Sequence, residues 1–251
     1  MRDMKKITSI LMTAALTVGL ASSCSLFLEK PDTTGTVDQD AVFATTKNAQ
    51  AALMSCYRNV LRHGWPGGMG IGHSTYGALS GEVGRGYSWH GSYIISQQGL
   101  SVSGADGSDA GTDSYADSWS YIRECWLVNE NIDKVEDISE ADKAIVKAET
   151  LALIAYRYMG MFYRYGGVPI VRKSFASTDD LSVPRASVRE MVDFICELCD
   201  AACAVLPDAW DSANTGRLTK GAALAIKART LLFAARPLRR RKYSIPAWGV
   251  L

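Results

Sequence analysis

The stretch from Glu140 to Tyr165 constrains the fold of this chain more than any other. It reads E-A-D-K-A-I-V-K-A-E-T-L-A-L-I-A-Y-R-Y-M-G-M-F-Y-R-Y, with apolar residues at helical spacing. Two glycines follow it, and Pro169 comes just beyond, which is the usual signal that a helix stops. We therefore expect one long helix. The aromatic side chains from Tyr156 to Tyr165 should lie mostly in a core, packed against neighbouring helices.

Four more helices are predicted, and no convincing series of strands accompanies them. They span Asp40 to Leu61, Tyr115 to Val135, Ser187 to Leu206 and Lys220 to Ala235. Ser187 and Glu190 form a capping-box pattern, and Thr219 is suited to cap the last helix. Val168 to Val171 is expected to be a short extended piece. The pattern predicts an all-α fold of antiparallel, repeat-like helix pairs, although the repeat lengths are not regular enough to identify tetratricopeptides.

The first 23 residues have the order of a secretory signal. Basic residues precede the apolar run Ile7 to Leu20, which is shorter than the ~20 residues of a comfortable membrane span. Ala21-Ser22-Ser23-Cys24 then resembles a bacterial lipobox, with alanine at position 21 where leucine is usual. We expect lipidation of Cys24 and, because Ser25 follows it, sorting to the outer membrane. Ordinary cleavage beside an incidental cysteine is the alternative.

Composition favours a globular protein whose partners are not strongly charged. The 251 residues have a formal net charge of +1 and are 47% hydrophobic, which argues for a sizeable core and against nucleic-acid binding. Beyond Cys24, five cysteines remain, and an odd number does not suggest a disulfide framework. Cys196, Cys199 and Cys203 fall on one helical face without a second ligand pair nearby. We expect them to pack in a helix seam and not to bind metal.

The segment 62–113 is a long connection between predicted helices, and its part from His63 to Tyr93 is the predicted ligand-binding region. It is rich in glycine, serine and aromatic residues, and it is long for a connection, which is typical of functional loops. Aromatic rings stack on the C–H faces of sugars, and polar side chains hydrogen-bond to sugar hydroxyls. The residues predicted to contact a glycan are Trp65, Tyr76, Arg85, Tyr87, Trp89, His90 and Tyr93. The alternative for each tryptophan is that it only anchors the loop on the helices.

Other chemistries have weaker support in the same segment. The stretch Gly72 to Tyr76 lacks the last glycine of a nucleophile elbow, and no strand precedes it. Asp106, Asp109 and Asp113 could ligate Ca²⁺, but their spacing fits no known loop, so a solvated loop is favoured. Loop packing is likewise favoured over a metal site for the histidines at positions 63, 73 and 90. No pair of carboxylates is singled out for glycoside hydrolysis. We expect no cofactor, no metal and no catalysis.

Five stretches of the sequence occur in an order that is familiar from one protein family. They are C-S-L-F-L-E-K-P, D-A-V-F-A-T-T-K-N-A-Q-A-A-L-M-S-C-Y, W-S-Y-I-R-E-C-W-L-V-N-E-N-I, A-E-T-L-A-L-I-A-Y-R-Y-M-G-M-F-Y-R-Y-G-G-V-P-I-V and G-R-L-T-K-G-A-A-L-A-I-K-A-R. From about Cys24 to Ala235, the chain resembles the N-terminal half of the SusD/RagB family, the outer-membrane nutrient-binding lipoproteins of Bacteroidetes. One departure is Ile154, which stands where the family usually has arginine, so the resemblance does not carry over a buried ion pair at this position.

The resemblance implies an all-α fold of tetratricopeptide-like helix pairs with a long loop insertion. It implies a surface-exposed outer-membrane lipoprotein that captures a glycan, or sometimes a peptide, without acting on it chemically. It also implies delivery to a TonB-dependent, SusC-like channel. Ligand contacts vary among family members, so the resemblance assigns none here. Two alternatives stay open: a helical-repeat lipoprotein scaffold that binds protein partners in the envelope, and a lipoprotein glycosidase.

These observations divide the chain into four parts. We expect a lipoprotein signal peptide at 1–23, a tether at 24–39 and a SusD-like N-terminal helical domain at 40–235. The remaining residues, 236–251, form a basic stretch that is unlike any continuation in the family. They predict a frameshift or a fragment, and a genuine basic tail is the alternative.

Overall fold

A computed structural model describes residues 39–62, 115–176 and 178–236. Within these ranges the secondary structure is helical, without strands, as the sequence predicts. None of the helices in this part of the chain is long and apolar enough to cross a membrane. The signal peptide, Cys24, nearly all of the tether and the seven predicted glycan contacts lie outside the described residues, as do the histidines and the Asp106–Asp113 group.

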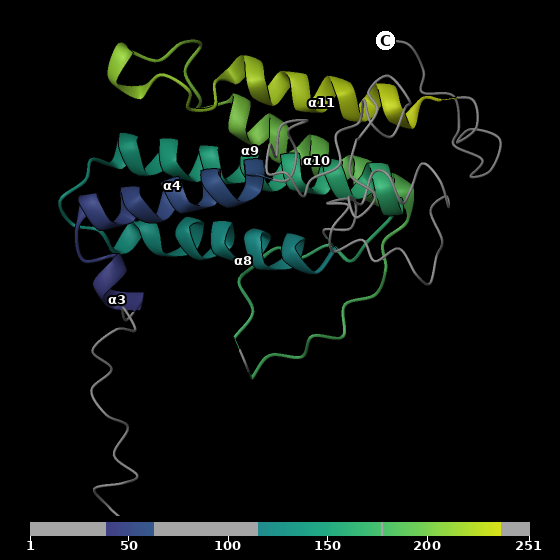
Figure 1. Ribbon diagram of the computed structural model, residues 1–251, viewed down its shortest axis with the longest axis horizontal. Helices are drawn as coiled ribbons and strands as arrows, with labels where there is room; N and C mark the ends of the chain where they lie inside the picture. The colour runs from purple at the N-terminus through teal and green to yellow at the C-terminus, as the bar shows by residue number, and fades with distance from the viewer. Residues whose placement is uncertain (1–38, 63–114, 177, 237–251) are drawn as a thin grey trace, which may run out of the picture. The chain divides into compact units, whose positions relative to one another are not determined.

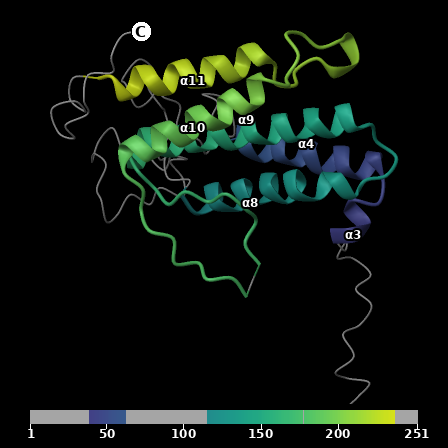
Figure 2. The ribbon, with the colours of Figure 1, turned by 180° about the vertical axis from the view of Figure 1, so that it is seen from behind.

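Five long helices build the described part of the chain (Figures 1 and 2). They are α4 (Thr46–Arg62), α8 (Tyr115–Asn131), α9 (Glu140–Tyr165), α10 (Val188–Cys203) and α11 (Lys220–Ala234). Three single turns accompany them: α3 (Gln39–Val42) and the 3-10 helices η1 (Ile132–Lys134) and η2 (Ser212–Asn214). The helices from Asp40 onward belong to one compact unit.

Side-chain caps explain where three of the helices begin. Ser139 accepts a hydrogen bond from the Asp142 N–H at the start of α9, and Thr219 accepts one from the Ala222 N–H at the start of α11. Ser187 and Glu190 form the predicted capping box of α10 in full. Each cap satisfies backbone donors that the first turn leaves without a partner.

The first predicted helix is two helices. The sequence suggests one helix from Asp40 to Leu61, whereas α3 ends at Val42 and α4 begins at Thr46. Thr45 provides the reason, because its hydroxyl accepts from the Asn48 N–H at 3.3 Å and so caps a new helix. The Asn48 side chain then donates to the Ala41 carbonyl at 3.1 Å, which ties the two helices together.

The helices pack as antiparallel neighbours around one main core. In the α8–α9 hairpin, Asn129 donates to the Thr150 hydroxyl near the turn, while the rings of Tyr115 and Tyr165 meet at the open ends. Helix α4 lies against both, and α10 packs on α9 and α11. Tyr158 and Phe162 are fully buried, as expected for the core face of α9.

Ile154 and the three cysteines of α10 also fall in this packing. Ile154 is fully buried in the main core, as an apolar residue there should be. On α10, Cys199 is buried in the same core, Cys196 is half-buried at its edge, and Cys203 is half-buried against a second, smaller apolar cluster. The three thiols therefore follow one helix seam as predicted, but only the middle one is enclosed.

The glycine pair after α9 serves two different steric needs. Gly166 ends the helix with φ of 76°, which glycine adopts without strain. Gly167 has an ordinary φ, but a Cβ there would lie 1.9 Å from the Ala186 carbonyl oxygen. This close approach allows the predicted extended piece to form a bridge between Pro169 and Arg185. Arg185 also donates to the Gly167 carbonyl at 2.7 Å and thereby holds the chain at the end of α9.

Candidate functional site

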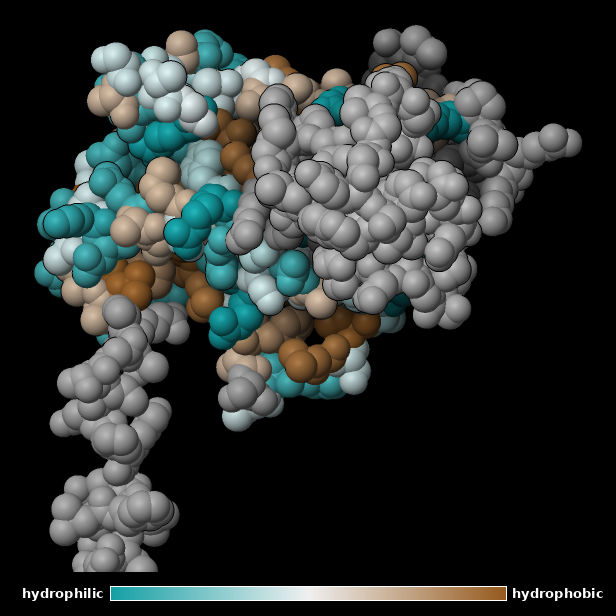
Figure 3. All heavy atoms as spheres, in the orientation of Figure 1, coloured by the Kyte–Doolittle hydropathy of each residue, from teal (hydrophilic) through white to brown (hydrophobic). Residues whose placement is uncertain are grey.

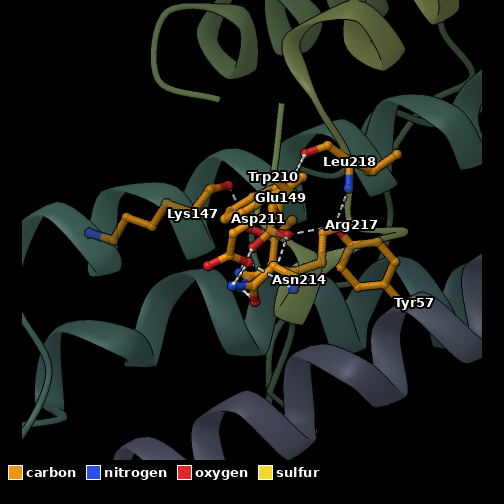
Figure 4. A network of polar contacts seen from close by, with 9 residues as sticks. Tyr57, Lys147, Glu149, Trp210, Asp211, Asn214, Arg217 and Leu218 are labelled. Carbon is orange, nitrogen blue, oxygen red and sulfur yellow. Dashed lines mark hydrogen bonds and ion pairs between the residues drawn. The ribbon is translucent and has the colours of Figure 1, made fainter. Parts of the chain in front are cut away.

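A buried carboxylate lies at the centre of the described bundle. Glu149 on α9 has no exposed surface, and its Oε1 accepts from the Tyr57 hydroxyl of α4 at 2.6 Å. Arg217, in the connection before α11, grips both carboxylate oxygens: Nε donates to Oε1 at 2.8 Å and Nη2 donates to Oε2 at 2.5 Å. We refer to Tyr57, Glu149 and Arg217 as the polar clamp (Figure 4).

The polar clamp fastens the connection between α10 and α11 onto the bundle. The Tyr57 hydroxyl accepts from the Leu218 N–H at 2.9 Å, so it links α4 to the connection as well as to Glu149. The Arg217 guanidinium lies 4.2 Å from the Trp210 ring centre, and the Trp210 indole N–H donates to the Leu218 carbonyl. The Tyr57 hydroxyl, the Arg217 guanidinium and the Trp210 indole N–H each donate to an acceptor within the chain.

Burial is the main cause of the shifted pKa of Tyr57 in the polar clamp. It raises the pKa of Tyr57 far above the ordinary phenol value, and the neighbouring charge of Glu149 raises this pKa further. The hydrogen bonds to Glu149 raise the pKa of Arg217, so the guanidinium stays charged. Both carboxylate oxygens are held by Arg217, so Glu149 is committed to this pair. The arrangement is that of a structural ion pair, not of a proton donor or ligand site.

Aromatic rings gather around the C-terminal half of α9 and the start of α8. Tyr115, at the start of α8, meets Trp119 and Tyr165 edge to face, with ring centres 5.5 and 5.1 Å apart. Trp119 in turn contacts the buried Tyr158 at 6.3 Å. We refer to Tyr115, Trp119, Tyr158 and Tyr165 as the aromatic end. Its outermost ring, Tyr115, is 38% exposed, and edge-to-face neighbours of this kind hold a ring in a fixed orientation.

A second buried charge lies between α8 and α9. Arg157 is 4% exposed, and its Nε donates to the Ser118 hydroxyl at 3.1 Å, while the guanidinium lies 5.2 Å from the Tyr121 ring centre. Its Nη2 is buried and has no hydrogen-bond partner. Burial, together with the like charge of Arg164, lowers the pKa of Arg157. This arginine is therefore less completely satisfied than Arg217.

The described residues that flank the predicted ligand-binding segment are Arg62, at the end of α4, and Tyr115 of the aromatic end. The segment 63–114 follows α4 in the chain and precedes Tyr115, the first residue of α8. Asn59, near the end of α4, donates to Glu124 of α8 at 2.7 Å, so the last turns of α4 lie against the first half of α8. The predicted glycan contacts from Trp65 to Tyr93 are themselves outside the described residues.

Sequence reasoning did not identify the polar clamp or the aromatic end as sites. Glu149 and Arg217 of the clamp both lie in stretches that carry the family resemblance. Nothing in the sequence indicates that the two side chains contact each other. The described residues contain no group of three or more histidine, cysteine, aspartate or glutamate side chains arranged to hold a metal ion. On the face in Figure 3, the described surface mixes hydrophilic side chains with small apolar patches.

A family model matches residues 76–232 of the chain. The family is SusD-like, with the description "starch-binding associating with outer membrane". The match covers more than half of the sequence and includes α8, α9, α10 and nearly all of α11. A search of curated protein sequences gave no match.

Solved structures share the fold. A SusD-like protein from Bacteroides fragilis is 26% identical, with a TM-score of 0.58 over 78% of this chain and 36% of its own. A SusD-like carbohydrate-binding protein from the same species is 23% identical, with a TM-score of 0.58 over 76% and 38%. Surface glycan-binding protein A from Bacteroides thetaiotaomicron, solved with laminarihexaose, is 18% identical, with a TM-score of 0.57 over 76% and 39%. The chain spans less than two-fifths of the length of these three proteins.

Proposed function

We propose that this chain, which belongs to the SusD-like family, binds a glycan at the outer membrane without acting on it chemically. The observation that carries the proposal is the aromatic end. It presents the edge-to-face Tyr115 ring where the aromatic-rich segment 63–114 rejoins the helices. Aromatic faces at a fixed orientation suit the C–H faces of sugar rings. Solved proteins that share the fold include one with bound laminarihexaose, which supports this class of ligand.

The finer assignment concerns the ligand contacts. We propose that Trp65, Tyr76, Arg85, Tyr87, Trp89, His90 and Tyr93 contact the glycan together with Tyr115. The rings would stack on sugar faces, and the arginine and histidine would hydrogen-bond to hydroxyls. The polar clamp would only keep the helices in place, because its donors are already used.

The proposal also includes a cellular location and a partner protein. Cys24 would carry the lipid anchor, and the protein would face the exterior and deliver its glycan to a TonB-dependent, SusC-like channel. A Cys24→Ser variant should be released from the membrane fraction. Protease added to intact cells should digest the wild-type protein. Cross-linking in the membrane should recover a β-barrel transporter, and recovery of only periplasmic or envelope-assembly proteins would favour the scaffold alternative instead.

The binding experiment uses laminarihexaose and maltoheptaose as probes. Isothermal titration should show saturable binding of at least one probe, with no new reducing ends after long incubation. Trp89→Ala and Trp65→Ala should each weaken binding about 5–10-fold, which corresponds to ~1–1.4 kcal/mol. Tyr163→Ala is the control, because that ring lies against Phe233 between α9 and α11. Hydrolysis of a probe would contradict the non-catalytic assignment, and unchanged binding by both tryptophan variants would contradict the assigned contacts.

A further inference from the structure

Two cysteines from different helices meet in the main core. Cys56 lies on α4 and Cys125 lies on α8, and neither side chain has exposed surface. Their thiols hydrogen-bond to each other, and this bond is the largest cause that raises the pKa of Cys125 well above its usual range, followed by burial. The sequence shows no hint of this pairing, because the two residues belong to separate predicted helices on either side of the segment 62–113.

Polar contacts hold the end of α4 to α8 and its start to the connection that follows η1. Asn59 donates to Glu124 at 2.7 Å, one turn beyond Cys56, and at the far end both the N–H and the hydroxyl of Thr46 donate to Asp137 at 2.7 Å. The two helices are antiparallel. The step from Asn59 back to Cys56 along α4 therefore runs in the same direction as the step from Glu124 forward to Cys125 along α8. At ~1.5 Å of rise per residue, Cys56 and Cys125 lie within about 3 Å of the same axial level.

We propose that Cys56 and Cys125 form an interhelical disulfide when the exported chain folds in the presence of an external disulfide. The inference rests on the proposed location outside the cytoplasm, where disulfides form and persist. It also explains the odd count of cysteines in the mature chain: one pair is joined, and the three cysteines of α10 remain thiols. The external disulfide is any small-molecule disulfide or protein disulfide of that compartment.

The exchange balances in two steps. One cysteine thiolate attacks a sulfur of the external disulfide, forms a mixed disulfide and releases one thiolate. The second cysteine thiolate attacks the protein sulfur of that mixed disulfide, which closes the Cys56–Cys125 bond and releases the other thiolate. The protein pair loses two electrons, and the external disulfide gains them. Both thiols are enclosed once α4 docks on α8, so the exchange takes place during folding, before the core closes.

The cysteines of α10 cannot compete for this bond within their own helix. Cys196, Cys199 and Cys203 are three or four residues apart, where Cβ atoms on a helix are ~5–6 Å apart. A disulfide needs Cβ atoms about 3.5–4.5 Å apart.

The bond would close a chain loop that contains the whole segment 63–114. It would join the helix that precedes the segment to the helix that follows it. A covalent link of this kind stabilises the fold chiefly by restricting the unfolded chain. We expect the oxidised protein to melt about 5–10 °C above the reduced protein.

The test is to refold the full chain in a buffer of oxidised and reduced glutathione, quench with acid, alkylate and map the peptides by mass spectrometry. The expected result is a peptide pair joined through Cys56 and Cys125, lighter by two hydrogens than the two thiol peptides, with Cys199 alkylated. Recovery of both Cys56 and Cys125 as alkylated thiols in the refolded monomer would overturn the proposal, as would a dominant bond between other cysteines.

Variants make the assignment specific. Cys56→Ala should abolish both the linked peptide and the rise in melting temperature on oxidation. Cys199→Ala, which removes an equally enclosed cysteine, should keep both. If Cys56→Ala does not fold, the peptide map of the wild-type chain decides alone. The map involves no glycan, so it separates this inference from the binding proposal.

Discussion

Two arginines that pack against buried residues of the bundle, the half-buried Arg217 and the buried Arg157, are held in opposite ways. At the polar clamp, Arg217 has a bidentate carboxylate partner in Glu149, a further acceptor in Asn214 and a flanking indole. Next to the aromatic end, Arg157 has one hydroxyl, a tyrosine ring and a buried Nη2 without a hydrogen-bond partner. The first arginine closes a network that supports the fold, whereas the second leaves donor capacity unused.

This contrast separates the contacts that hold the helices from the surface that we propose for the ligand. A buried charge is stable only when its partners satisfy it, and the polar clamp meets that condition. The aromatic end is held by ring contacts, and these leave the Tyr115 ring partly exposed. Variants at the clamp should therefore change stability, and variants at Tyr115 should change binding.

The largest effect is expected from Arg217→Met. The substitution leaves the Glu149 carboxylate buried without its charged partner, which should lower the free energy of unfolding by ~3–5 kcal/mol. Arg172→Met is the control, because the Arg172–Glu197 pair is exposed and should contribute only ~0–1 kcal/mol. Urea unfolding followed by circular dichroism measures both. Equal losses in the two variants would contradict the structural role of the clamp.

Gly167→Ala should rank next. Its Cβ would meet the Ala186 carbonyl oxygen at 1.9 Å, so the extended piece beside the aromatic end has to shift, at ~1–3 kcal/mol. Gly160→Ala provides a control of opposite sign. Gly160 lies inside α9, and a Cβ there meets only an Arg164 guanidinium nitrogen at 3.7 Å, so alanine should stabilise the helix by up to ~1 kcal/mol. Thermal melting of the two variants checks both signs, and a stable Gly167→Ala protein would show that the close approach is not needed.

Tyr57→Phe should cost ~1–2 kcal/mol at neutral pH, because the hydroxyl donates to Glu149 and accepts from the Leu218 N–H. The effect should depend on pH. The folded-state pKa of Tyr57 is raised above the unfolded value near 10, so its contribution is complete below about pH 10 and is lost as the pH rises further. The gap in unfolding free energy between wild type and variant should therefore narrow above about pH 10. A gap that stays constant there would contradict the burial of this hydroxyl.

The smallest effect is expected from Arg157→Met. The variant loses one hydrogen bond to Ser118 but also removes a poorly satisfied buried charge, so the change should stay within ~1 kcal/mol. Comparison with Arg217→Met by the same urea titrations gives the sharpest test of the contrast between the two arginines. A loss as large as that of Arg217→Met would show that Arg157 has a strong partner.

The helices could be predicted because their signals are local. Ser187 with Glu190, Thr219 and the glycine pair after Tyr165 each act on the nearest backbone groups, and the structure places the helix ends there. The break before Thr46 was missed because the threonine cap at position 45 competes with an otherwise continuous apolar pattern.

The clamp and the thiol pair could not be predicted in this way. Glu149 meets Arg217, and Cys56 meets Cys125, only after helices far apart in the sequence have docked. The spacing of apolar residues along the sequence does not indicate which distant residues will contact each other. The sequence predicts Tyr115 as the start of a helix. The exposure of its ring and its contacts with Trp119 and Tyr165 depend on how the start of α8 packs beside the end of α9.

The most direct test of the central claim is the affinity of Tyr115→Ala for laminarihexaose or maltoheptaose, whichever the wild-type chain binds, measured by isothermal titration beside Tyr163→Ala. The account predicts that Tyr115→Ala binds about 5–10-fold more weakly, with its melting temperature nearly unchanged, while Tyr163→Ala binds like the wild type. Wild-type affinity in Tyr115→Ala would contradict the assignment of the aromatic end as a glycan surface.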